Sequence, residues 1–224
     1  MCGRFTLRTR ANQLLLELGV ENTPLDWTPR YNIAPTQKVM AVRHRYKGEG
    51  REAVLLRWGL VPSWASDLTI GARMINARAE TIAEKPSFRT PLKKRRCVIL
   101  ADGFYEWQKQ GKSKQPYYIQ REDENPFVFA GLWESWGKAG GEPIETCTII
   151  TTEPNSLMAP IHDRMPVILE PEKADLWLDP EVEGVELLQS LLVSYDPSEM
   201  KAYATNPVVG SVMNDSPDCI TPIE

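Results

Sequence analysis

The residue with the most distinctive chemistry in this sequence is Cys2. The initiator methionine is normally removed before a small second residue, so we expect the mature chain to begin with cysteine. Such a terminus places an α-amine, with an ordinary pKa of about 7.7–8.0, beside a thiol with a pKa near ~8.5. The amine can attack an aldehyde to give a Schiff base, and the thiol can then close on the imine carbon to give a thiazolidine. Alternatively, the thiolate alone is the nucleophile and the amine is its base.

Other polar side chains stand among apolar or aromatic residues, where a hydrophobic core would favour an apolar side chain. Asn76 lies inside an apolar run and is followed by Arg78, while Asn32 lies between an aromatic residue and a proline. Glu106 is flanked by aromatic residues, and burial there should raise its pKa into the range of a general acid or base. His162 is one of two histidines and stands between two prolines, beside an acid and a base. Buried polar groups that satisfy the backbone are the common alternative for each of them.

Charge is divided unevenly between the two halves of the chain. Residues 1–114 hold 21 Lys and Arg against 10 Asp and Glu, and residues 115–224 hold 5 against 20. The net charge of −4 therefore combines a half at +11 with a half at −15. This asymmetry indicates one basic face that binds an anion and one acidic face that is solvated. Two of the seven tryptophans, Trp64 and Trp107, stand in loop-like or strand-end contexts where they could stack on nucleic-acid bases.

The elements that position these residues are mainly strands. Apolar β-rich runs bounded by Gly, Pro and charged turns predict strands at 38–45, 52–58, 97–101, 116–120, 127–132 and 146–151. Helices are expected from Thr9 to Gly19, at 79–83, after Pro154, at 171–178 and at 184–193, with a proline-punctuated loop over 22–37. There is no regular βαβ alternation. The pattern indicates one α+β domain over 1–224, with a mixed, mainly antiparallel and barrel-like sheet and short inserted helices.

Several classes of protein are excluded by what the sequence lacks. No apolar stretch approaches the ~18 residues of a membrane helix, and no secretory signal opens the chain, so a cytoplasmic protein with reduced thiols is expected. Walker, Rossmann, HExxH, CxxC and GxSxG patterns are missing. No metal or organic cofactor is implied, and nothing demands more than a monomer.

Five short sequence segments, or islands, taken in order, resemble one known family. They are Met1-Cys2-Gly3-Arg4-Phe5, Tyr31-Asn32-Ile33-Ala34-Pro35, Ile75-Asn76-Ala77-Arg78-Ala79-Glu80-Thr81, Ala101-Asp102-Gly103-Phe104-Tyr105-Glu106-Trp107 and Ile161-His162-Asp163-Arg164-Met165-Pro166. The same order occurs in SRAP-domain proteins, the SOS-response-associated abasic-site processing family. The resemblance covers nearly the whole chain and ends with Val212-Met213-Asn214-Asp215.

The resemblance implies a function and a role for each site residue. In that family the N-terminal cysteine crosslinks to the ring-opened aldehyde of an abasic site in single-stranded DNA, within one compact α+β domain. By position, Cys2 matches the crosslinking residue, Asn76 the amide that holds it, and Glu106 and His162 the acid/base pair. The DNA-binding positions implied in the same way are Arg4, Asn32, Trp64, Arg78, Trp107 and Arg164. An autocatalytic removal of Met1 and a lyase side reaction are further expectations, as is association with the nucleoid when DNA is bound.

Two alternatives belong to other classes of protein. An amidotransferase with an N-terminal cysteine nucleophile also begins Met-Cys-Gly, but such glutaminase domains usually continue with isoleucine or valine, and Arg4 stands here. They also carry an Asn-Gly turn and an Arg-Gly-Pro-Asp stretch that this sequence lacks. A non-catalytic module that binds modified bases would use the same groove but would form no covalent adduct.

Overall fold

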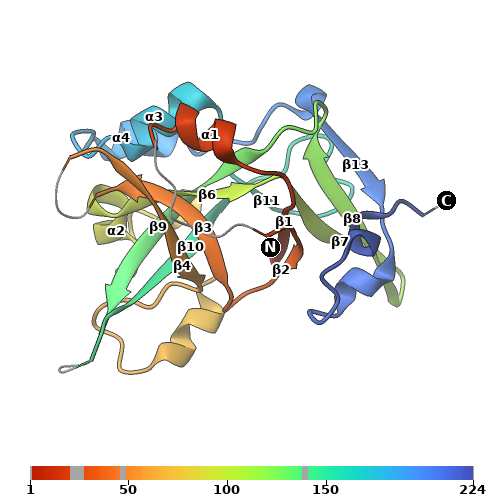
Figure 1. Cartoon of the computed structure of the whole chain (residues 1–224), viewed down its shortest axis with the longest axis horizontal. Helices are drawn as coiled ribbons and strands as arrows, with labels where there is room; N and C mark the ends of the chain where they lie inside the picture. The colour runs from red at the N-terminus through yellow and green to blue at the C-terminus, as the bar shows by residue number, and fades with distance from the viewer. Residues whose placement is uncertain (1, 21–27, 46–48, 138–140, 224) are drawn as a thin grey trace.

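The strands of the core form a closed barrel. The computed structural model describes residues 2–20, 28–45, 49–137 and 141–223. The barrel strands are β3 (Lys38–His44), β4 (Arg51–Trp58), β6 (Arg96–Ala101), β9 (Phe127–Trp136) and β10 (Ile144–Thr152). Four of the five pairings are antiparallel, and the ring closes because β10 pairs with β9 on one side and, in parallel, with β4 on the other (Figure 1).

Three short strands extend the barrel at the end of β10. β5 (Asn76–Arg78) pairs in parallel with β10, so that Asn76 lies opposite Ile149 and Arg78 opposite Thr151. β11 (Met165–Pro166) pairs antiparallel with the same stretch of β10, and β12 (Ile168–Leu169) pairs with β9. The chain on either side of His162 is thereby fixed beside Asn76 and Arg78.

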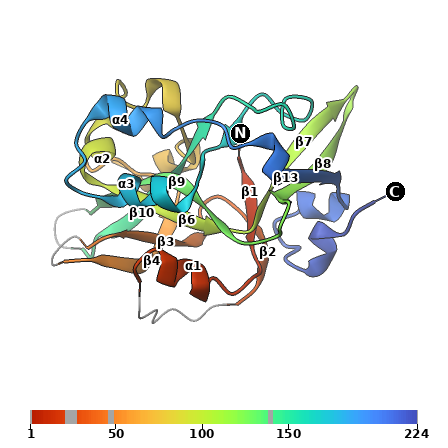
Figure 2. The ribbon, with the colours of Figure 1, turned by 90° about the horizontal axis from the view of Figure 1, so that it is seen from above.

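A second sheet of five strands packs beside the barrel. Its order is β13 (Met200–Ala204), β8 (Ser113–Arg121), β7 (Gly103–Gln110), β1 (Arg4–Leu7) and β2 (Arg30–Ile33). Strands β7 and β8 form a long hairpin that projects from the body of the molecule (Figure 2). The chain passes from the barrel strand β6 into β7 through Asp102.

Two sets of contacts hold β1 of this sheet against the barrel and so fix the position of Cys2. The ring of Phe5 packs edge-on against Trp58 and Phe129, with centroids 5.2 and 5.7 Å away. The carboxylate of Asp102 is fully buried and accepts hydrogen bonds from the Thr6 hydroxyl and from the backbone N–H groups of Arg8 and Thr9. A buried carboxylate is stable only when it is satisfied in this way.

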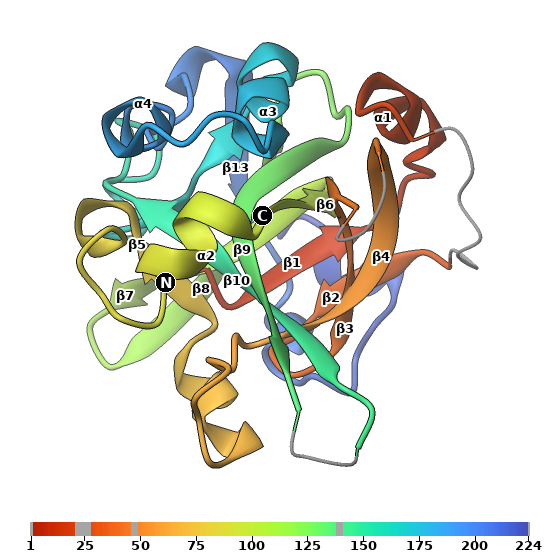
Figure 3. The ribbon, with the colours of Figure 1, turned by 90° about the vertical axis from the view of Figure 1, so that its left-hand side faces the viewer.

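The helices are short and cover the outside of the sheets. Figure 3 shows α3, α4 and α1 along one edge of the molecule and α2 against the barrel. Their bounds are α1 (Asn12–Glu17), α2 (Arg89–Lys94), α3 (Pro171–Leu178) and α4 (Val185–Ser190), with 3-10 turns η1 (Leu68–Arg73), η2 (Ala79–Thr81), η3 (Pro197–Glu199), η4 (Pro207–Gly210) and η5 (Pro217–Ile220). No helix among the described residues is long and apolar enough to cross a membrane.

The α+β barrel-like fold is confirmed, but several local predictions are wrong. The first helix begins at Asn12, with Ala11 instead of Thr9 as its N-cap, and the backbone N–H groups of Arg8 and Thr9 are held by Asp102 ahead of it. The expected loop over 22–37 contains strand β2, and the part of it at 22–27 lies outside the described residues. The segment after Pro154 forms turns rather than a helix, with the Asn155 side chain accepting from the Met158 N–H.

Candidate functional site

Cys2 is completely buried at the junction of the two sheets. Burial raises the pKa of its thiol well above the usual range, and the negative charge of Glu106 adds to the rise. The thiol is therefore neutral at physiological pH and cannot act as a pre-formed thiolate. Any reaction at this sulfur needs a neighbouring group that receives or relays its proton.

Glu106 and His162 provide such a pair. Glu106 lies on β7 with an exposed fraction of 2%, and burial raises the pKa of its carboxyl to about 8, as its aromatic neighbours led us to expect. The Nε2 atom of His162 lies 3.7 Å from Glu106 Oε2. Because the pKa of Glu106 lies near neutral pH, both protonation states are accessible there, which suits a group that donates and accepts protons.

The state of the His162 ring is set by its other nitrogen. Burial lowers the pKa of His162, although Asp163 opposes this with an Oδ1 atom 3.0 Å from Nδ1. The backbone N–H of Arg164 donates to Nδ1 at 3.1 Å, so the neutral ring carries its proton on Nε2, on the side of Glu106. The imidazole can thus pass a proton toward the carboxylate.

Asn76 supplies an amide whose hydrogen-bonding capacity is unused. Both Oδ1 and Nδ2 are buried and have no hydrogen-bond partner in the described part of the chain. Buried polar groups are nearly always satisfied in folded proteins, so this amide at the start of β5 is available to a partner other than the described residues. A bound molecule would supply the missing partners.

The predicted arginines around this centre differ in their contacts, and Arg78 and Arg164 show the contrast. Arg78, at the end of β5, is exposed and forms no salt bridge with described residues. Arg164 instead donates through both terminal nitrogens to Glu80, at 2.8 and 2.9 Å, and also to the Thr151 carbonyl at 2.7 Å. Arg164 chiefly, and Arg78 to a lesser degree, lower the pKa of Glu80.

Arg4 and Asn32 are joined to the C-terminal segment. Arg4 donates to Asn32 Oδ1 and to the Val209 carbonyl, both at 2.8 Å. The amide of Asn32 is fully buried and donates to the carbonyls of Val209, Ser211 and Asn214. Asn32 therefore holds the segment that cradles Arg4, and any effect of it on DNA would be indirect. Its role in DNA binding remains a prediction.

The two tryptophans occupy different surroundings. Trp64 is 63% exposed, in the loop before η1. Trp107 is half-buried beside Tyr105, with ring centroids 6.5 Å apart. An exposed tryptophan on a loop is available for stacking, whereas Trp107 offers only part of its ring.

Some residues at the site were not singled out from the sequence. Glu80 lies in one of the quoted islands, but its pairing with Arg164, 84 positions away, depends on the fold. Asp215 accepts from Arg30 and from the backbone N–H groups of Tyr31 and Asn32, and so fastens the C-terminal segment over β2. An acid close to the C-terminus carries no local signal for such a role.

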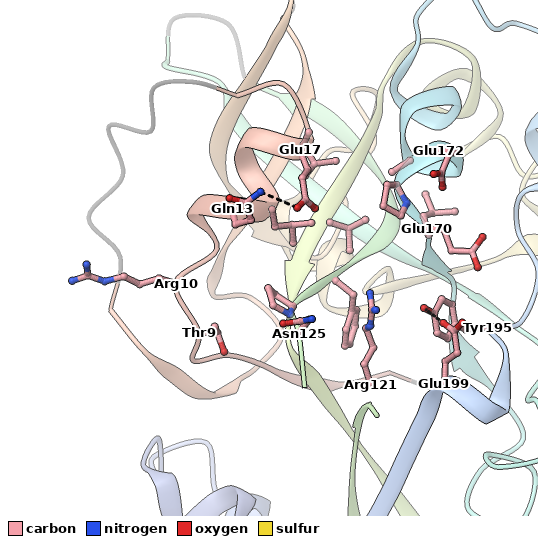
Figure 4. A pocket seen from close by; sticks show the side chains of 18 residues that line it. Thr9, Arg10, Gln13, Glu17, Arg121, Asn125, Glu170, Glu172, Tyr195 and Glu199 are labelled. Atoms are coloured by element: carbon pink, nitrogen blue, oxygen red, sulfur yellow. Dashed lines mark hydrogen bonds between the residues drawn. The ribbon is translucent and has the colours of Figure 1, made fainter. Parts of the chain in front are cut away.

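A separate hollow between α1 and α3 differs from this centre in its chemistry. Its volume is about 600 Å³, and its lining includes none of Cys2, Asn76, Glu106 or His162. Figure 4 shows carboxylates around it, and three of them are already engaged: Glu17 by Gln13, Glu170 by Lys173 and Glu199 by the Tyr195 hydroxyl. The labelled acids are Glu17, Glu170, Glu172 and Glu199. Arg10 and Arg121 also line this acid-rimmed hollow, but the four carboxylates outnumber them, and a net negative rim disfavours phosphate.

Comparison with known proteins adds a family and a set of relatives. A family model described as "SOS response associated peptidase (SRAP)" matches residues 1–212. The abasic site processing protein YoqW of Bacillus subtilis is 47% identical, over 98% of this chain and 99% of its own. The abasic site processing protein HMCES of Gallus gallus is 36% identical, over 88% of this chain and 67% of its own. A crystal structure of a protein from Bacteroides thetaiotaomicron superimposes with a TM-score of 0.88 at 31% identity, covering all of both chains.

Proposed function

The chain belongs to the SRAP family, and on that premise we propose that it crosslinks itself to abasic sites in single-stranded DNA. The bond would be a thiazolidine between Cys2, after Met1 has been removed, and the aldehyde of the ring-opened sugar. The observation that carries the proposal is a fully buried Cys2 whose thiol senses the charge of Glu106, beside His162. One chain supplies all of these groups, so a monomer suffices.

The proposed crosslinking reaction has three steps. His162 assists opening of the deoxyribose hemiacetal, which exposes the aldehyde at C1′. The α-amine of Cys2 adds to this carbon, and loss of one water gives an imine, with Glu106 exchanging the protons. The S–H of Cys2 then adds across the C=N bond, sulfur to carbon and hydrogen to nitrogen. The net change is loss of one water between protein and DNA.

The surrounding residues position the strand for this reaction. Arg4, Arg78 and Arg164 would bind phosphates near the lesion, and Trp64 would stack on a base. The amide of Asn76, whose two polar atoms have no partner among the described residues, would hydrogen-bond to the processed terminus or to the sugar. Phosphate would compete with Glu80 for the guanidinium of Arg164.

Two side activities follow from the same groups. Hydrolysis of the bond between Met1 and Cys2 consumes one water and frees the α-amine, so this site could carry out its own processing. The imine also acidifies the C2′–H bond. Loss of that proton, with departure of the 3′ phosphate and its electron pair, would be a lyase reaction.

The proposal is tested with a single-stranded oligonucleotide that contains one abasic site. Wild-type protein should give a shifted band on a denaturing gel and an intact mass equal to protein plus DNA minus one water. Cys2→Ala should give neither. Cys2→Ser and Cys2→Ala both keep the amine, so either should yield an adduct only after borohydride reduction of the imine. Binding without any covalent adduct in the wild type would instead indicate a non-catalytic module.

A further inference from the structure

A second hollow, of about 590 Å³, begins at the catalytic pair and leads away from it. Its walls are the outer part of β7 and the loop at 159–163, which the Gln108 side chain holds by donating to the Pro160 carbonyl at 3.0 Å. Within the described residues, β7 has no strand partner on that side beyond Tyr105, where β1 begins. The hollow therefore runs along a free strand edge, from Glu106 and His162 toward the tip of the hairpin.

Two lysines line the far end of this hollow. Lys109 on β7 and Lys114 on β8 are directly opposite one another in the hairpin. Both are exposed, and neither has a salt bridge within the described ranges. Like charges placed directly opposite each other destabilise a strand pair, so the fold gains nothing from this arrangement. Departures from local preference of this kind are expected where a ligand compensates for them.

The lysines continue a row of residues on one face of the sheet. Side chains alternate along a strand, so Tyr105, Trp107 and Lys109 share a face, and Arg4 lies opposite Tyr105 on the neighbouring strand. Lys109 is four residues beyond Tyr105, which places it about 13 Å along the strand. The row has a cation at each end, and of the two rings between them Tyr105 is fully buried and Trp107 is half-buried. Glu106 and Gln108 lie on the opposite face of β7, so the hollow, which both sets of residues line, crosses the free edge of this strand. Single-stranded nucleic acid is bound by this combination of charge and stacking.

The electrostatics of the hollow agree with an anionic occupant. Glu106, with its pKa raised by burial to about 8, is mostly neutral at pH 7, and burial lowers the pKa of His162, with Lys109 among the lesser contributors. The effect on His162 indicates that the Lys109 ammonium lies near the ring. Among the charged residues of the lining, Asp163 alone then opposes the two lysines.

We propose that Lys109 and Lys114 together form a phosphate-binding subsite, which holds a phosphodiester of the abasic strand on the side of Trp107 away from Arg4. The subsite rests on the proposed function, because it requires the strand to reach Cys2. It would fix the path of the strand past Glu106 and His162, and would keep the lesion in place during the covalent steps. The ligand is the phosphate oxyanion, on either the 3′ or the 5′ side of the lesion.

The hairpin provides its own control. Lys112 lies in the turn of the same hairpin, is exposed, and does not line the hollow. The double variant Lys109→Gln with Lys114→Gln should weaken binding of a single strand carrying a tetrahydrofuran abasic analogue by roughly tenfold at low salt. It should also lower the slope of log K against log salt by about 0.7, the value for one phosphate on a single strand. Lys112→Gln should change neither quantity.

The position of the phosphate is found by removing its charge. A methylphosphonate at one linkage, tested 3′ and 5′ of the lesion in turn, should weaken binding to the wild type at a single position. The same substitution should cause no further loss with the double variant, because the two changes remove one interaction. The thermal midpoint of the double variant should not fall, since the repulsion between the lysines is relieved.

The outcomes separate this subsite from the proposed function. If the double variant binds and crosslinks like Lys112→Gln, or if every methylphosphonate effect persists in it, the subsite is refuted while crosslinking by the wild type still stands. If the wild type forms no adduct with abasic DNA, the proposed function fails. If it also binds no strand, the subsite fails with it.

Discussion

Among the proposed catalytic residues, Glu106 is the one whose pKa burial brings close to neutral pH. Its carboxyl is almost completely buried, and its pKa of about 8 stands far above the ordinary value of 4.5. The folded protein therefore keeps a proton that the unfolded chain has already lost between these two pH values. Folding takes up this proton, so the stability of the native state declines as pH rises through that range and levels off above about 8.

Replacing Glu106 with glutamine should remove this decline. Glu106→Gln keeps the shape of the side chain but cannot ionise, so the variant should gain on the order of 1–4 kcal/mol over wild type between pH 5 and pH 9. The free energy of unfolding in urea, followed by tryptophan fluorescence at several pH values, measures this gain. The same variant should lose crosslinking, as expected where a site trades stability for activity.

A comparison with an exposed glutamate makes this result specific. Glu84→Gln alters a solvent-exposed side chain and should leave the pH dependence of stability unchanged. A stability difference between Glu106→Gln and wild type that is the same at pH 5 and pH 9 would contradict the raised pKa.

How far individual residues can be predicted depends on whether their surroundings are local. The aromatic neighbours of Glu106 adjoin it in the sequence, and they correctly indicated a raised pKa. The pairing of Arg164 with Glu80 and the open amide of Asn76 depend on strands that meet only in the fold. For such residues the sequence supplies a residue type, and the fold supplies its partner.

At the scale of elements, the C-terminal segment depends on one side chain. The buried amide of Asn32 donates to carbonyls at 209, 211 and 214, at 3.2, 2.9 and 2.6 Å, and its oxygen accepts from Arg4. These bonds tie η4 and the residues after it to β2. The segment in turn fixes the guanidinium of Arg4 through the carbonyls of Val209 and Gly210.

Asn32→Ala should therefore loosen this segment and weaken DNA binding through Arg4. Loss of the buried amide leaves carbonyl groups without a hydrogen-bond donor, which should lower the free energy of unfolding by about 1–3 kcal/mol. Amide hydrogen exchange should accelerate over residues 206–215 and remain unchanged in the barrel strands. Asn125→Ala, at an exposed asparagine of the acid-rimmed hollow, is the matched control. Weaker DNA binding with unchanged exchange at 206–215 would instead indicate that Asn32 touches the strand directly.

The elements that could be predicted from the sequence are those that follow a continuous apolar or helical pattern of residues. All five barrel strands follow long apolar runs, and α3 was predicted with its exact bounds at Pro171 and Leu178. Strands β1, β2, β7 and β13 were not predicted, because they are short or carry polar and charged residues on one face. Their partners lie far away in sequence: β1 pairs with β7, and β13 with β8.

At the scale of the whole molecule, the uneven charge of the two halves corresponds to two unlike regions. The basic half supplies Arg4, Arg78 and the hairpin lysines, and these lysines line the hollow that begins at Glu106 and His162. The acidic half supplies Glu170, Glu172 and Glu199 to the hollow beside α1. A net charge of −4 is thus compatible with DNA binding, provided that the strand is confined to the basic region.

This division predicts which arginines contribute to the salt dependence of binding. Arg78 is exposed beside the site, whereas Arg10 is exposed at the acid-rimmed hollow, where its side chain extends away from the other labelled residues (Figure 4). Arg78→Gln should lower the slope of log K against log salt by about 0.7, since one phosphate contact on a single strand is lost. Arg10→Gln removes the same charge from the molecule and should leave the slope unchanged.

The measurement is fluorescence anisotropy of a labelled single strand with a tetrahydrofuran analogue, titrated at a series of salt concentrations. The two variants have the same net charge, so any difference between them reports position rather than overall charge. The loss in Arg78→Gln should be largest at low salt and shrink as salt rises, because screening weakens the same contact in the wild type. Equal slopes for the two variants would mean that the strand responds to the net charge of the whole molecule, and the confined basic region would then be wrong.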